Sequence, residues 1–258
     1  MINAKKDIVL ITGGSSGLGR TIAVILATKG YTVVILDVNP IDIKLASLHY
    51  YQCDVSDFNQ IRKTGSMVKQ QIGIVTILIN NAAVTSKETI LELTEQSIRR
   101  TLEVNLLSHF WTIKTFLPDM LELRRGYIVT VSSALGYIGP ARLSCYSASK
   151  GGLITMHDSI THETKGSGIK TLLVTMGQMN SDMFRGVQTP SEFLAPVVST
   201  VDGATAIVDA LENGYGGEIT LPTYAKLLPW TRVVPGAIIE FVRAVFRMDE
   251  AMDTFVGR

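Results

Sequence analysis

The chain has 258 residues, of which 46% are hydrophobic and 18% charged, so it is able to bury a sizeable core. Its net charge of +1 argues against a nucleic-acid-binding protein, because phosphate binding needs a surplus of lysine and arginine on one face. Two cysteines, Cys53 and Cys145, make no disulfide framework, which favours a reducing, cytoplasmic compartment. Residues 1–14 hold no apolar run long enough for a signal peptide or membrane span.

Seven short runs rich in β-branched residues predict strands at 7–12, 31–37, 49–54, 75–80, 126–133, 169–175 and 218–221. Longer stretches of helical pattern separate most of them, as at 19–30. Only residues 38–48 separate the second and third runs, so we expect a short helix at most there. Apolar strands that alternate with helices indicate parallel pairing and right-handed crossovers. The sequence therefore predicts a single α/β domain over residues 1–258, with a doubly wound parallel sheet and helices on both faces.

The stretch ITGGSSGLGR joins the first predicted strand to the first helix. Glycine permits a tight turn and lets the backbone approach a pyrophosphate, and the following helix N-terminus offers free N–H groups and a positive dipole end. The alternative is a glycine-rich turn without a ligand, but the position between strand and helix favours nucleotide binding. The cofactor-binding residues expected in this loop are Gly13, Ser15, Ser16, Gly17, Leu18 and Gly19.

Two acidic residues follow the next strands. Asp37 ends the second strand, where a carboxylate accepts hydrogen bonds from both hydroxyls of an adenosine ribose and repels a 2′-phosphate. No basic residue stands beside it and Ser16 precedes Gly17, so NAD is favoured over NADP; the alternative is a carboxylate that caps the next turn. Asp54, followed by Val55, ends the third strand and either meets the adenine or caps the next helix.

Further candidates lie where later strands end, because doubly wound sheets bind ligands at that edge. Asn80, Asn81 and Ala82, where the fourth strand ends, are expected to line the floor of the cofactor crevice, and Ala83 follows them as a further cofactor-binding residue. Asn105 stands in an apolar setting, so its amide must find hydrogen-bond partners. Ser133 ends the fifth strand, where the helix that begins nearby converges on it.

That helix carries Tyr146 and Lys150, four residues apart and therefore on one face. An ammonium beside the phenol favours the phenolate and lowers the pKa of the tyrosine. Taken alone, the pair is also typical of a solvated helix face, so its interpretation depends on what surrounds it.

The ordered set TGGSSGLG, Asp37, NNAA, Asn105, Ser133 and YSASK resembles the motifs of the short-chain dehydrogenase/reductase family over essentially the whole chain. The resemblance implies a Rossmann sheet of about seven strands in the order 3-2-1-4-5-6-7. It implies that Tyr146 is the catalytic acid/base and that Ser133 binds the substrate oxygen. Lys150 would hold the nicotinamide ribose and lower the pKa of Tyr146, and Asn105 would anchor a water of a proton relay.

The family also implies an NAD cofactor and a homodimer or homotetramer that pairs through the helices after the fourth and fifth strands. The chain departs from its pattern at Ala83, where glycine is usual, and at Met176, where proline usually precedes Gly177. Met179 aligns with the residue whose backbone holds the carboxamide. Ser181 aligns with the threonine usual near the phosphates.

The substrate side is expected in two segments. Residues 180–196 follow the sixth strand and form a lid, whose apolar side chains either shape a pocket or pack as an ordinary loop. Residues 222–248 are apolar with scattered cations, which suits contact with a membrane or lipid droplet, a cover over an apolar cavity, or burial against the domain or a partner subunit. This segment resembles the retinol and hydroxysteroid dehydrogenase branch, and the short second connection fits fungal relatives of it. His157 and His162 are five apart, so no metal site is predicted.

The sequence thus predicts an NAD-dependent enzyme that interconverts an alcohol and a carbonyl on an apolar small molecule of lipid, steroid or retinoid type. One alternative is an NADPH-dependent ketoacyl-type reductase, against which Asp37 argues. The other is a non-catalytic dinucleotide-binding protein, against which the intact Asn105, Ser133, Tyr146 and Lys150 argue.

Overall fold

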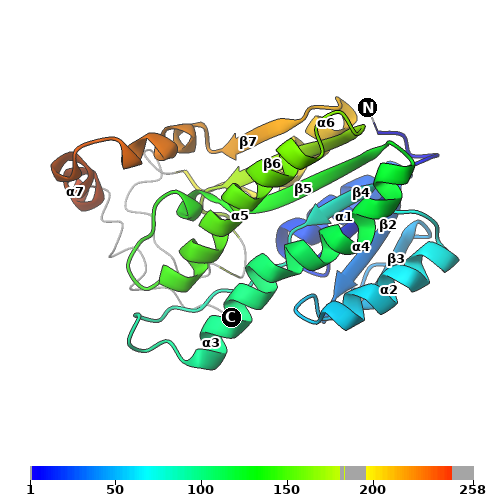
Figure 1. Cartoon of the computed structure of the whole chain (residues 1–258), viewed down its shortest axis with the longest axis horizontal. Coiled ribbons are helices and arrows are strands. Elements are labelled where there is room, and N and C mark those ends of the chain that lie inside the picture. Colours follow the sequence, from blue (N-terminus) through cyan, green and yellow to red (C-terminus); the bar gives the residue numbers. More distant parts are fainter. Residues whose placement is uncertain (1, 181–182, 184–195, 246–258) are drawn as a thin grey trace.

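The computed structural model describes residues 2–180, 183 and 196–245. Its centre is a seven-stranded parallel sheet in the order β3-β2-β1-β4-β5-β6-β7 (Figure 1). The strands are β1 (Ile8–Thr12), β2 (Thr32–Asp37), β3 (Leu48–Gln52), β4 (Ile77–Asn80), β5 (Gly126–Ser133), β6 (Ile169–Met176) and β7 (Gly217–Leu221). The predicted fold class and strand order are confirmed.

Helices cover both faces of the sheet, because successive apolar strand residues point to opposite sides. Ile11 of β1 belongs to the core under α1 (Gly17–Thr28) and α6 (Thr200–Glu212). Its neighbour Leu10 belongs to the other core, under α2 (Phe58–Gln71), α4 (Ser108–Glu122) and α5 (Ser144–Glu163). The second layer, with α4 and α5 side by side over the middle of the sheet, faces the viewer in Figure 1.

Three connections position the site. Residues 38–47, between β2 and β3, contain no helix, within the expectation of a short helix at most. Helix α3 (Glu95–Leu102) continues through a π-helical turn, η1 (Glu103–Leu107), directly into α4. A short 3₁₀ turn, η2 (Ala134–Gly136), follows β5 and leads toward α5.

The chain beyond β7 forms a 3₁₀ segment, η4 (Thr223–Arg232), and α7 (Gly236–Val245), which lie far from the N-terminus (Figure 1). Leu227, Trp230, Val233 and Ile238 are 51–73% exposed, so they do not pack against the domain. Contact of residues 222–248 with lipid or with a partner subunit stays a prediction, and residues 246–248 lie outside the described part. No helix among the described residues combines the length and the apolar content that crossing a bilayer requires.

Candidate active site

The glycine loop adopts a backbone that side chains would obstruct. Gly13 and Gly17 have φ of +66° and +52°, in the left-handed region that glycine tolerates best. A Cβ at Gly13 would lie 2.8 Å from Cα of Ala82, and a Cβ at Gly19 would lie 2.3 Å from the carbonyl oxygen of Gly13. At Gly17 nothing lies within 4 Å, because this residue borders a large cavity. The loop is therefore tight against the protein and open toward the cavity.

Asn81 braces this loop from the end of β4. Its Nδ2 donates to the carbonyl oxygens of Thr12 and Gly13, at 3.0 Å each. The backbone N–H groups of Asn81 and Ala82 donate to Oγ1 of Thr12, at 3.0 and 3.1 Å. The predicted lining role of Asn81 is thus joined by a structural one, since its amide holds the turn between β1 and α1.

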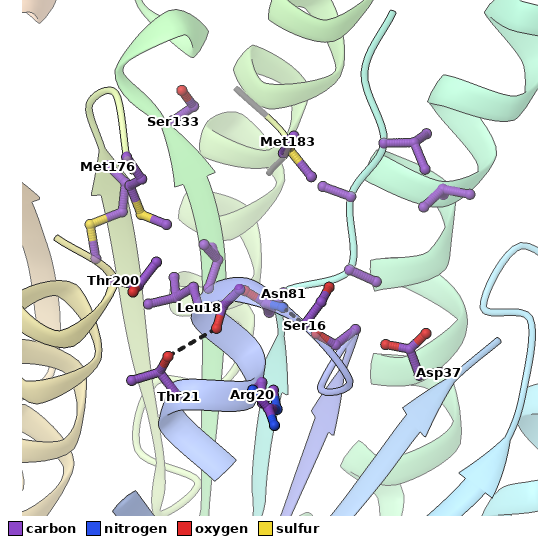
Figure 2. Close-up of a pocket in the computed structure, with 18 of the residues that line it drawn as sticks. Ser16, Leu18, Arg20, Thr21, Asp37, Asn81, Ser133, Met176, Met183 and Thr200 are labelled. Carbon is purple, nitrogen blue, oxygen red and sulfur yellow. Dashed lines mark hydrogen bonds between the residues drawn. The ribbon is translucent and has the colours of Figure 1, made fainter. Parts of the chain in front are cut away.

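Asp37 lies at the end of β2 and is 9% exposed. Its carboxylate accepts hydrogen bonds from the N–H groups of Ser15 and Asn39, each at 3.0 Å. The same cavity wall includes Arg20, which extends from α1 below Ser16 (Figure 2) and pairs with Asp42 at 2.8 Å. Arg20 was not predicted from the sequence, because it stands neither next to Asp37 nor before Gly17; its position in the first turn of the helix was the available signal.

Asp54 also lines the cavity, at the end of the sheet where β3 lies. Burial raises its pKa, but hydrogen bonds from the Ser56 hydroxyl and N–H and from Arg100 outweigh burial and hold the pKa below its usual value. Arg100 of α3 reaches both carboxylate oxygens, at 2.9 and 3.1 Å. The helix that follows is capped by Asp57, so the capping alternative for Asp54 is wrong.

The cavity has a volume of about 1210 Å³ and extends along the carboxyl ends of the central strands. The predicted cofactor residues that line it are Gly13, Ser16, Gly17, Leu18, Asp37, Asp54, Val55, Asn81, Ala82, Ala83, Tyr146, Lys150, Gly177 and Met179. Ser15 and Gly19 belong to the loop but are not among the lining residues, and Ser181 lies outside the described residues. The expectation that Asn80 lines the crevice is wrong, because its side chain is buried and accepts a hydrogen bond from Thr112 of α4 at 2.7 Å. Of the expected lid, 180–196, Asn180 and Met183 line the cavity and most of the remainder is outside the described part.

Ser133, Tyr146 and Lys150 meet near one end of this cavity, with Ser133 at the tip of β5 (Figure 2). Ser133 hydrogen-bonds with the phenol of Tyr146, and its Oγ accepts from the N–H of Leu135 at 3.2 Å. Lys150 Nζ lies 5.7 Å from the centroid of the Tyr146 ring and donates to the carbonyl oxygen of Val131 at 3.0 Å. The three side chains that sequence reasoning grouped are therefore brought together.

Burial controls the electrostatics of this group. It raises the pKa of Tyr146 to about 12, with the hydrogen bond from Ser133 acting in the opposite direction. Burial also lowers the pKa of Lys150 from 10.5 to about 8. The expected lowering of the Tyr146 pKa by the ammonium is not what the structure gives, because the cost of burying a phenolate dominates. Tyr146 is therefore a neutral phenol at pH 7 in this protein, and a hydrogen-bond donor.

Asn105 lies in the π-helical turn η1 and is fully buried. Its Oδ1 accepts from the N–H of Val84 at 2.7 Å, while its Nδ2 donates to the carbonyl oxygen of Val84 at 2.8 Å and to Ser149 at 3.2 Å. These bonds tie the chain leaving β4 to α5, one residue before Lys150. The predicted water-anchoring role of Asn105 stays a prediction.

A parallel Rossmann sheet whose first crossover carries a glycine loop and a carboxylate at the end of β2 is the architecture of nicotinamide-dinucleotide-binding proteins. The residues fit such a group: the glycine loop leaves room where a pyrophosphate must approach, and the N-terminal amides of α1 begin beside it.

The family model for short chain dehydrogenases matches residues 7–192, and the chain belongs to the short-chain dehydrogenase/reductase family. Membership implies a nicotinamide dinucleotide cofactor and a small-molecule substrate. It thus defines the chain as an oxidoreductase of this family.

Relatives extend over nearly the whole chain. Short-chain dehydrogenase/reductase family 16C member 6 of Bos taurus is 36% identical and is aligned over 98% of this chain and 84% of its own length. An uncharacterized oxidoreductase of Saccharomyces cerevisiae is 32% identical over 98% of this chain and 86% of its own length. Retinol dehydrogenase 10 of Homo sapiens is 35% identical over 74% and 68%. The predicted resemblance to the retinol dehydrogenase branch is confirmed.

A solved structure agrees with the fold. The crystal structure of a short-chain dehydrogenase from Streptomyces avermitilis superposes with a TM-score of 0.76, at 25% identity, and covers 94% of this chain and 95% of its own. The similarity therefore extends over nearly the whole chain rather than the cofactor loop alone.

Proposed function

We propose that this protein interconverts an alcohol and a carbonyl on an apolar small molecule, with Tyr146 exchanging the proton at the substrate oxygen. The observation that carries the proposal is the hydrogen-bonded Ser133–Tyr146 pair at one end of a cavity whose other wall is the glycine loop. When bound, the nicotinamide supplies the hydride chemistry. The protein supplies orientation and the proton.

Each residue has a distinct task in this scheme. Ser133 holds the substrate oxygen beside the phenol, and its own position is fixed by the N–H of Leu135. Tyr146, protonated at pH 7, donates to the oxygen when a carbonyl is reduced. Lys150 lies one helical turn after Tyr146 and donates to the carbonyl oxygen of Val131. From this position its ammonium stabilises the Tyr146 phenolate once the proton has left. Alcohol oxidation starts from that phenolate, so its rate rises with pH.

The substrate is proposed to be apolar because Met176, Met183 and Val197 line the same cavity as these groups. The resemblance to proteins named retinol dehydrogenase supports the same choice. We propose NAD as the cofactor because Asp37 faces the cavity with both backbone hydrogen bonds made, ready for ribose hydroxyls.

One observation favours the alternative, an NADP-dependent reductase: Arg20 lines the same wall and could pair with a 2′-phosphate. The Arg20 guanidinium is already paired with the Asp42 carboxylate, so NAD remains the proposed cofactor.

The test is a panel of lipid-like alcohols and ketones, read by the absorbance of the reduced cofactor with NAD(H) and NADP(H). Tyr146→Phe should lower kcat by about 100-fold or more while cofactor binding persists, because one oxygen is lost from the proton-transfer group. Tyr51→Phe is the matched control, since the Tyr51 hydroxyl bonds Gln71 at the surface, away from the cavity. Unchanged turnover in Tyr146→Phe would overturn the proposed mechanism.

A further inference from the structure

Buried polar side chains form a small layer within the mostly apolar core between the sheet and the helices α4 and α5, which run side by side over β4 and β5 (Figure 1). Asn80 ends β4 and pairs in register with Thr130 of β5. His109, one turn after Asn105, is the second residue of α4. Asn80 and His109 are each 1% exposed and Lys150 is 2% exposed. Polar groups at this depth need hydrogen-bond partners, because water cannot reach them from the surface.

Part of this layer is satisfied by the protein. Oγ1 of Thr112 donates to Oδ1 of Asn80 at 2.7 Å, and Nδ1 of His157 lies 3.0 Å from Oγ1 of Thr130. Within the described residues, however, three buried atoms of this layer have no hydrogen-bond partner: both ring nitrogens of His109 and Nδ2 of Asn80. An amide and both imidazole nitrogens left unpaired at this depth would destabilise the fold, because each has lost its hydrogen bonds to water without gaining a partner.

The charge state of His109 decides whether its two ring nitrogens donate or accept hydrogen bonds. Burial, then the positive charge of Lys150 and, where it is protonated, that of His157, hold the pKa of His109 well below 6.5. The two strands contribute the uncharged Asn80 and Thr130. His109 is therefore neutral, with one donor and one acceptor nitrogen. The amide of Asn80 offers donors, and the Lys150 ammonium has further hydrogens beyond the one that Val131 accepts.

A water molecule, with two donors and two acceptors, complements this set. We propose that His109 and Asn80 bind an internal water that links them to the ammonium of Lys150, and that His109 is thereby a positioning residue for this lysine. The site is separate from Asn105, whose amide oxygen and nitrogen are taken by Val84 and Ser149. Tyr146 and Lys150 line the cavity, and neither His109 nor Asn80 is among the lining residues.

The water itself is tested without turnover. A high-resolution crystal structure of the full chain should place a water within hydrogen-bond distance of His109 and Asn80, and His109→Phe should lose it. Histidine ¹⁵N NMR should find His109 neutral from pH 5 to 9, and Lys150→Met should raise its pKa because one positive charge is removed. A dry site, or protein groups bonded to both nitrogens of His109, would overturn the proposal.

The positioning role rests on the proposed function and is tested by pH profiles. For carbonyl reduction, kcat falls at alkaline pH. In His109→Phe the midpoint of this fall should move down by about one pH unit, because the Lys150 ammonium loses an acceptor that stabilised its charged form. His109→Gln, which keeps a donor and an acceptor, should restore most of the shift. His162→Phe, at an exposed position on the same helix α5, should leave the profile unchanged.

These outcomes separate the two proposals. If the wild-type protein oxidises or reduces nothing, the proposed function fails, while the water and the NMR titration still decide the site. If His109→Phe and His109→Gln both keep the wild-type pH profile and differ only in thermal stability, the residue is merely structural and the positioning role is wrong. If His109→Phe does not fold, His109→Gln and the titration of wild type against Lys150→Met carry the test.

Discussion

Gly19→Ala is the sharpest test of how the cofactor loop is built. The added methyl would lie 2.3 Å from the carbonyl oxygen of Gly13 and 2.5 Å from Nδ2 of Asn81. Neither atom is the free end of a flexible side chain: one is backbone, and the other is tied to the carbonyls of Thr12 and Gly13. The loop must therefore move away from the start of α1.

The expected cost follows from that geometry. Inserting a methyl against atoms that cannot rotate away destabilises a packed site by about 1–3 kcal/mol. In the proposed cofactor site, displacing the loop would also remove at least one backbone hydrogen bond to the cofactor phosphates. Since a hydrogen bond to a charged group contributes about 1.5–3 kcal/mol, the Kd for NAD should rise about tenfold or more.

Urea unfolding and a fluorescence titration with NADH measure the two effects. Gly236→Ala is the matched control, because no atom lies within 4 Å of its added methyl and the residue begins α7. That variant should be neutral or up to about 1 kcal/mol more stable, with unchanged cofactor affinity. Wild-type stability and Kd in Gly19→Ala would refute the idea that the loop leaves no space at this position.

Two further predictions concern charge. Asp37→Ser should shift the ratio of NADP to NAD affinity toward NADP by about tenfold or more, because a carboxylate that would face a 2′-phosphate is removed while Arg20 stays. Competitive titration measures this ratio, and an unchanged ratio would contradict the proposed ribose site. His157 has its pKa lowered by burial from 6.5 to about 4, so its contribution to stability is present above pH 6.5 and lost as pH falls to 4, by at most about 3 kcal/mol. In His157→Gln, urea unfolding at several pH values should therefore lose less stability over this window than the wild type; equal losses would be incompatible with a neutral buried imidazole.

The strand order and the glycine loop could be predicted because each signal is local. β-branched runs and glycines report the conformation of their own few residues, and the rules of parallel crossovers then assemble the sheet. The grouping of Ser133 with Tyr146 followed from the same rules, since both come from the carboxyl edge. Asp37 could be placed for the same reason, at the end of a strand.

What escaped prediction depends on contacts between distant segments. Arg20 reaches the cavity wall because Asp42, in the helix-free connection after β2, holds it there. Arg100 comes from α3 to Asp54, although 46 residues separate the two. The direction of the Tyr146 pKa shift depends on how completely the domain buries the phenol, and spacing from Lys150 does not reveal burial.

The side-chain amide of Asn105 behaves toward Val84 as a neighbouring strand would, receiving its N–H and supplying a donor to its carbonyl. One asparagine side chain thus satisfies both backbone groups of Val84, in the loop four residues after the end of β4. Asn105→Ala would remove both hydrogen bonds to Val84 as well as any proton route through Asn105. A lowered rate in Asn105→Ala is therefore informative only when it is compared with Ser149→Ala. That second variant removes the hydrogen bond between Asn105 and Ser149 and leaves both hydrogen bonds to Val84 in place.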